Sequence, residues 1–130
     1  DTLGEKGANE ISALLSEDLT EPTEQTGEPT ICKLITKEDA VLDLTKPAET
    51  LEREIRAYLG WPGSKTALKL NNGDQLEITV TEANVVKEPD NSPLTFKTSK
   101  DYLKITKLKL PGKQEMTTKD FLNGYSSKLN

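Results

Sequence analysis

A change from helix to strand is predicted at Ile55-Arg56-Ala57-Tyr58-Leu59-Gly60-Trp61-Pro62-Gly63-Ser64. Gly60 suits the left-handed conformation that closes a helix, and Pro62 prevents the helix from continuing. After Gly63, apolar residues recur at every second position, which is the period of a β-strand. We therefore predict a helix before this turn and an antiparallel sheet after it.

The predicted helix begins near Thr45 and has Pro47 in its first turn. Its apolar face consists of Ala48, Leu51, Ile55 and Tyr58 or Leu59. A shorter helical turn is predicted from Thr36 and Asp39, whose spacing resembles a capping box.

Short strands and tight turns are predicted downstream of Gly63. The sequence Asn71-Asn72-Gly73-Asp74 is a strong hairpin signal, and alternation resumes at Leu76, Ile78 and Val80. A further strand is predicted at Val85-Val86. After a loop at residues 88–93, Leu94, Phe96 and Thr98 form another alternating segment, and a turn is predicted at residues 99–101.

The apolar pattern changes parity within the last long strand. Leu103 and Ile105 share one face, whereas Leu108 and Leu110 have the other parity. A bulge near Thr106-Lys107 would place all four side chains on the core side.

The predicted fold class is α+β. About five short strands form a small antiparallel β-barrel, similar to an oligonucleotide-binding fold, preceded by a helix. A short C-terminal helix follows, capped by Thr117 with Asp120 and burying Phe121 and Leu122. Trp61 is expected to fill the bottom of the barrel, in preference to stacking on an unpaired base.

The N-terminal part differs from the rest. Residues 7–19 have one apolar helical face, formed by Ala8, Ile11, Leu14, Leu15 and Leu19. Residues 20–30 contain two prolines, one glycine and no large apolar side chain, which is typical of a linker.

Composition limits the chain to one small domain with an aliphatic core, since 130 residues include 33% hydrophobic and 5% aromatic residues. No apolar run approaches the roughly 20 residues that span a bilayer. The start at Asp1, without Met or a signal peptide, is expected of a piece of a longer protein. A single cysteine, Cys32, fits a reducing compartment.

Charge is distributed unevenly. The net charge is −5, but residues 1–30 hold eight acidic residues and one lysine. The last forty residues hold eight lysines and three acidic residues. Phosphate binding depends on where lysines cluster, and a basic surface that only aids solubility explains the charge equally well.

No catalytic or metal-binding residue is predicted. The chain has no histidine, which is the commonest general base and metal ligand. Metal-ligand spacings, glycine-rich phosphate loops and nucleophile–base pairs are also missing from the sequence. We therefore expect no catalysis by this chain alone.

Three segments resemble the C-terminal domain of the methionyl-tRNA formyltransferase family. Residues 30–39 resemble its linker, while Ile55-Arg56-Ala57 and Trp61-Pro62-Gly63 match its most characteristic segment. The sequence departs from the family at Leu34, where a basic residue is common, and at Gly60 and Ser64, where Pro and Ala are frequent.

The resemblance implies a parent enzyme that transfers a formyl group from 10-formyltetrahydrofolate to the amino group of methionyl-tRNA. The catalytic residues and the cosubstrate would lie in an N-terminal domain, so this chain is expected to bind no cofactor. Residues 1–19 would be the helical end of the catalytic domain, 20–35 the linker and 36–130 the C-terminal domain. A cytoplasmic monomer that binds initiator methionyl-tRNA, without membrane attachment, is expected.

Basic residues are the candidate tRNA contacts, because lysine and arginine position phosphates without reading sequence. Lys107 and Lys109 share a strand face, and Arg56 has a competing partner in Glu52. The full candidate set is Lys33, Lys37, Arg56, Lys65, Lys69, Lys107, Lys109 and Lys113.

Two alternatives remain. The same domain could belong to a sugar-nucleotide formyltransferase or a formyltetrahydrofolate hydrolase or dehydrogenase, as a scaffold or dimerisation element without RNA binding. It could also be an interaction domain that meets no nucleic acid.

Overall fold

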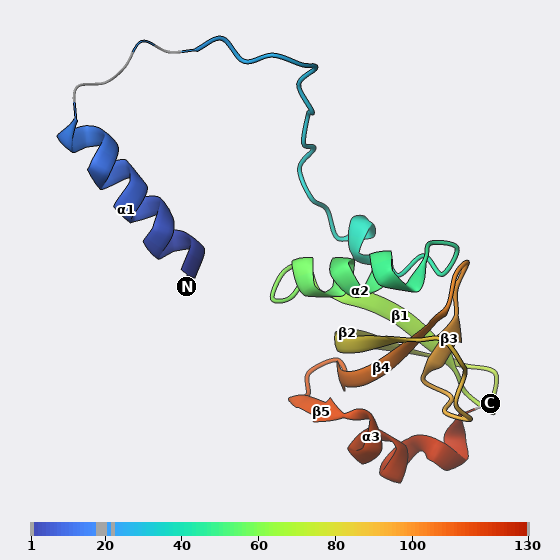
Figure 1. The fold of residues 1–130 in the computed structure, drawn as a ribbon. Coiled ribbons are helices and arrows are strands. Elements are labelled where there is room, and N and C mark those ends of the chain that lie inside the picture. The colour runs from blue at the N-terminus through green and yellow to red at the C-terminus, as the bar shows by residue number, and fades with distance from the viewer. Residues whose placement is uncertain (1, 18–20, 22, 130) are drawn as a thin grey trace. The chain divides into compact units, whose positions relative to one another are not determined.

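The computed structural model describes residues 2–17, 21 and 23–129. The chain divides between Lys33 and Leu34 into two compact units, which we call unit 1 and unit 2 (Figure 1). None of the described helices is long and apolar enough to cross a membrane.

Unit 1 contains one helix, α1 (Thr2–Ser16), which begins and ends earlier than predicted. Its apolar side chains are all exposed, Ile11 by 59%, Leu14 by 58% and Leu15 by 75%. The predicted last member of this face, Leu19, lies outside the described residues. No helix or strand occurs in residues 23–33.

Unit 2 is built on a five-stranded antiparallel sheet that curls into a half-barrel (Figure 1). The strands are β1 (Ser64–Lys69), β2 (Gln75–Val86), β3 (Thr95–Lys97), β4 (Tyr102–Lys109) and β5 (Glu115–Thr117). Their order is β1-β2-β4-β3, and β5 also pairs with β4. The α+β class and five strands are as predicted, and Val85-Val86 belongs to the long β2.

Helix α2 (Ala48–Ala57) covers the inner face of the sheet and buries Ala48, Leu51 and Ile55, as predicted. The predicted cap at Thr45 is wrong, because the helix begins after Pro47. The Asp43 carboxylate instead accepts the Thr45 N–H at 3.0 Å and its hydroxyl at 2.7 Å, forming a local turn ahead of the helix.

The predicted turn at Thr36 is present as a 3-10 helix, η1 (Glu38–Ala40). The Asp39 carboxylate accepts the Thr36 N–H at 2.9 Å, which is the reciprocal half of a capping box.

The bulge predicted near Thr106-Lys107 is confirmed, and β2 carries a matching one. Val80 faces Leu108, Glu82 faces Lys107 and Ala83 faces Ile105, so Thr81 and Thr106 have no cross-strand partner. Each strand therefore gains one residue, and its inward parity changes. As predicted, Leu103, Ile105, Leu108 and Leu110 are all buried.

The C-terminus forms α3 (Thr118–Tyr125) and a 3-10 turn, η2 (Ser126–Lys128). The Thr117 hydroxyl accepts the Asp120 N–H at 3.2 Å, which confirms the predicted cap. Phe121 is 1% exposed, and its ring stacks on Tyr125 with centroids 4.8 Å apart. This helix thus supplies the only aromatic side chain that is fully buried among the described residues.

Trp61 does not fill the barrel, contrary to prediction, because its side chain is 60% exposed. The Gly63 N–H donates to the Tyr58 carbonyl at 3.0 Å and folds the intervening residues outward. Gly60 has φ +94° and Gly63 has φ +82°, a backbone region that favours glycine. The turn after α2 therefore presents Trp61 to solvent.

The loop before β3 is fixed to β4 by Asp90. Its carboxylate accepts a hydrogen bond from Lys104 Nζ at 2.6 Å, one from the Thr95 hydroxyl, and one from the Ser92 N–H at 3.3 Å. The hydrogen bond from Lys104 is the main reason that the pKa of Asp90 falls from 3.8 to about 2.

Replacing Phe121→Ala should lower the free energy of unfolding by about 3–5 kcal/mol, because it empties a fully buried aromatic site. Urea denaturation followed by circular dichroism measures the change. Leu59→Ala is the matched control, since Leu59 is 59% exposed, and it should stay within about 0.5 kcal/mol of the parent chain. Equal losses in both variants would contradict this core.

Acid should weaken the folded state partly through Asp90. Its folded pKa lies below the ordinary value, so its contribution is present above pH 3.8 and is lost as the pH falls through about 2. The midpoint temperature of Asp90→Asn should therefore vary less than that of the parent chain across this interval. Lys104→Met should flatten the same interval, and parallel curves for all three proteins would contradict the contact.

Candidate nucleic-acid interface

Strand alternation and register bring four of the predicted basic residues to the outer face of the sheet. Lys65 and Lys69 lie on β1, and Lys107 and Lys109 lie on β4. We call these four residues the outer-face lysines. Their backbone neighbours Leu68 and Leu108 point into the core, so the lysines point away from it.

Two of these lysines lie in one row across the sheet. Lys65 faces Thr79 on β2, and Thr79 in turn faces Lys109 on β4. Since neighbouring strands are ~4.8 Å apart, the two lysine backbones are roughly 10 Å apart. Lys107 lies two residues from Lys109 on the same face, so three ammonium groups are brought together by the fold.

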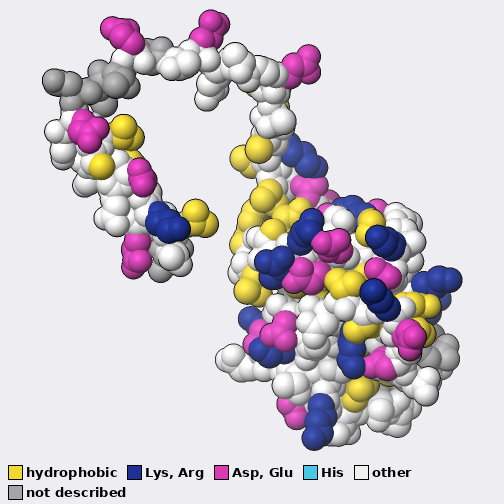
Figure 2. Space-filling model, in the orientation of Figure 1, with side chains coloured by type: hydrophobic (Ala, Val, Ile, Leu, Met, Phe, Trp, Pro, Cys, Tyr) yellow, Lys and Arg dark blue, Asp and Glu magenta, His cyan; other side chains and the backbone are white. Residues whose placement is uncertain are grey.

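Carboxylates lie between these lysines. Lys65 Nζ is 2.9 Å from Glu77, and Lys107 Nζ is 2.8 Å from Glu82. Glu115 is the cross-strand partner of Lys109. Dark blue and magenta side chains are accordingly mixed over the visible face of unit 2 (Figure 2).

The pair between Lys107 and Glu82 is held by hydrogen bonds that favour both charged forms. The bond from Lys107 lowers the pKa of Glu82, and a 2.7 Å hydrogen bond from the Thr106 hydroxyl lowers it further. The same contact raises the pKa of Lys107. Both groups are exposed, so solvent screens the pair and a phosphate can compete for the lysine.

Arg56 lies apart from the outer-face lysines, because α2 covers the opposite face of the sheet. Its guanidinium binds the Glu52 carboxylate through Nε at 2.7 Å and through a second nitrogen at 3.1 Å. This i,i+4 pair is the competing role expected from the sequence, and it raises the pKa of Arg56.

The remaining predicted residues are dispersed. Lys37 directly precedes η1, Lys113 lies in the turn between β4 and β5, and Lys33 belongs to unit 1. Lys37, Lys113, Lys69 and Lys109 form no ion pair with any residue that the structure describes.

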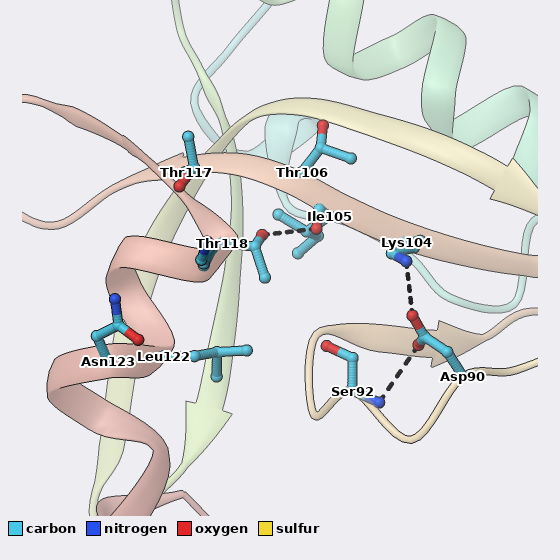
Figure 3. Close-up of a pocket in the computed structure, with 10 residues that line it drawn as sticks. Asp90, Ser92, Lys104, Ile105, Thr106, Thr117, Thr118, Leu122 and Asn123 are labelled. Atoms are coloured by element: carbon cyan, nitrogen blue, oxygen red, sulfur yellow. Dashed lines mark hydrogen bonds and ion pairs between the residues drawn. The ribbon is translucent and has the colours of Figure 1, made fainter.

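A hollow of about 460 Å³ lies where β3 and β5 leave a gap along β4 (Figure 3). The Thr118 hydroxyl bridges the gap by donating to the Ile105 carbonyl at 2.6 Å, and α3 adds Leu122 and Asn123. The charged groups at its rim are Asp90, Lys104 and Lys119.

The hollow could not be predicted from the sequence, because three segments that are far apart in the chain form it. Asp90 is held as a carboxylate by Lys104 and is therefore a structural partner, not a general base. Among the described residues, no group of three or more potential metal ligands occurs. The residues of the hollow are therefore suited to binding a molecule and not to catalysing a reaction on it.

Comparison with known proteins gives one family match, which covers residues 34–126 and is described as formyl transferase, C-terminal domain. This region comprises nearly all of unit 2.

Several relatives are methionyl-tRNA formyltransferases. That of Treponema denticola is 31% identical over 110 residues, covering 72% of this chain and 33% of that protein. That of Buchnera aphidicola subsp. Baizongia pistaciae is 37% identical over 115 residues, covering 78% and 34%. That of Francisella tularensis subsp. novicida is 29% identical over 114 residues, covering 82% and 36%.

The chain thus spans about a third of the length of these relatives. The matched region includes α2, the turn at Trp61 and all five strands. The chain belongs to the formyl transferase C-terminal domain family.

Proposed function

We propose that unit 2 is the tRNA-binding domain of a methionyl-tRNA formyltransferase and helps to hold initiator methionyl-tRNA for formylation. The family and the names of the relatives support the parent activity. The observation that carries the RNA contact is the row formed by Lys65, Thr79 and Lys109, with Lys107 beside it.

The chemistry would take place in the preceding domain, with 10-formyltetrahydrofolate as formyl donor. Residues 1–19 would be the helical end of that domain and residues 20–35 the linker to unit 2. The parent would be a cytoplasmic monomer. Unit 2 would contribute by holding the substrate in place, an effect that can lower a barrier by several kcal/mol when the geometry is well set.

The outer-face lysines would bind phosphates without selecting bases. Lys69 and Lys109 have no described ion-pair partner and would bind directly. Lys65 and Lys107 would first exchange a carboxylate for a phosphate, which costs little because solvent screens both exposed ion pairs. Weak, strongly salt-dependent binding is therefore expected from this unit.

A scaffold role in an enzyme acting on a small molecule is the second candidate. The observation that favours it is the alternation of Lys65 and Lys107 with Glu77 and Glu82, which leaves little net charge on the outer face. The two candidates differ in whether RNA affinity responds to this face.

Charge reversal of Lys107 and Lys109 together should weaken binding of initiator tRNA at least tenfold at low ionic strength, because two phosphate contacts become repulsive. The slope of log K against log salt should become shallower by about 2. Filter binding or fluorescence anisotropy with the chain measures both. Lys97→Glu with Lys100→Glu is the matched control, since it changes the net charge equally on and after β3.

Glu82→Gln provides the opposite test, because it removes the carboxylate that competes for Lys107. This variant should bind tRNA more tightly than the parent chain. Absence of any binding at low salt would refute the RNA role and favour the scaffold. If both double charge reversals weakened tRNA binding equally, the outer face would not be the specific contact surface.

A further inference from the structure

Unit 2 exposes a group of apolar side chains near the point where the chain enters it. Ile35 is 45% exposed, Val41 56%, Leu59 59% and Trp61 60%. We call these four residues the entry patch. Hydrophobic side chains gather on this side of unit 2, over its first residues and the turn after α2 (Figure 2).

Val41 and Trp61 both lie near the start of β1. Val41 forms a parallel β-bridge with Lys65, and the Leu42 N–H donates to the Lys65 carbonyl at 2.9 Å. Trp61 lies four residues before Lys65. Among the neighbouring charges, Lys65 is paired with Glu77 and Arg56 with Glu52.

The turn that carries Leu59 and Trp61 is fixed before any partner arrives. The Gly63 N–H binds the Tyr58 carbonyl at 3.0 Å, and the Leu59 N–H binds the Arg56 carbonyl at 3.4 Å. Exposed aromatic residues on an ordered backbone are the typical anchors of protein interfaces, since little conformational entropy is lost when they bind.

An open strand edge adjoins the patch. Because the Lys65 carbonyl points to the free side of β1, the N–H and C=O of Ala67 point to the same side. Val41 covers this edge at one end, and the bridge between Leu70 and Leu129 covers it at the other. Between them lies a hollow of about 130 Å³, lined by Val41, Lys65, Thr66, Ala67 and Glu77.

Polypeptide suits this surface better than RNA. Unpaired backbone groups at a sheet edge are completed by the backbone of another polypeptide segment, and apolar side chains fill the adjoining hollow. The family match is to a C-terminal domain, and the matched part of this chain covers only about a third of the relatives' length. The rest of such a polypeptide reaches unit 2 at Leu34, next to Ile35.

We propose that the entry patch and the open edge of β1 form the surface on which unit 2 docks against the preceding domain of its own polypeptide. A short tether places that domain at a local concentration of the order of millimolar, so a small apolar surface suffices. Docking here would cover Lys65 but leaves Lys107 and Lys109 on β4 free, and it does not depend on their binding RNA.

Cysteine labelling in the full-length enzyme tests the proposal. Val41→Cys is compared with Val85→Cys, both in a Cys32→Ser background, in the full-length protein and in the 130-residue chain. Val85 is also an exposed valine. It lies on β2 beyond Val80, the last β2 residue that pairs with β1, and so away from the proposed surface. Peptide mass spectrometry gives the maleimide rate at each site.

The rate at Val41→Cys should fall at least tenfold in the full-length enzyme, independently of protein concentration, while the rate at Val85→Cys stays the same. Adding Trp61→Ser should restore fast labelling. Equal rates in the two proteins would overturn the proposal, as would a decrease that requires a second copy and grows with concentration. A decrease that appears only with tRNA would assign the patch to RNA and overturn it too.

Discussion

The fold of unit 2 depends on the paired irregularity between β2 and β4. Thr81 on β2 and Thr106 on β4 are both unpaired in the ladder. Each strand therefore switches which alternate residues face the core at this point, and the cross-strand pairing before and after it is kept. This allows Val80, Ala83, Ile105 and Leu108 to share one core. The buried Thr81 hydroxyl, which has no hydrogen-bond partner among the described residues, is the local cost.

Features with local causes could be predicted from the sequence. The hairpin at residues 71–74, the Thr117 cap and the bulge at Thr106 each follow from neighbouring residues or from apolar parity. The position of Trp61 could not be predicted in this way, because a hydrogen bond between Gly63 and Tyr58 folds it outward. Strand β5 has only three residues, which is too short to show an alternating apolar pattern, and it is defined by its pairing with β4.

The candidate site shows the same division. Alternation placed Lys107 and Lys109 on one face, but their relation to Lys65 depends on register through Thr79, which no local pattern contains. The carboxylates that interleave with them also come from the neighbouring strand. On the outer face, Lys65 and Lys107 are therefore held in ion pairs with Glu77 and Glu82, and under our proposal phosphates would displace these carboxylates. The entry patch consists of apolar side chains. In our proposals, Lys107 and Lys109 contact RNA and the entry patch contacts the preceding domain.

Cross-strand nuclear Overhauser effects between β2 and β4 test the central arrangement most directly. The structure predicts backbone contacts that pair Glu82 with Lys107 and Ala83 with Ile105, with none that pair Thr81 or Thr106 across the ladder. Contacts pairing Thr81 with Lys107 and Glu82 with Thr106 would show an uninterrupted ladder. That result would turn half of the apolar residues of β4 away from the core and would contradict this account.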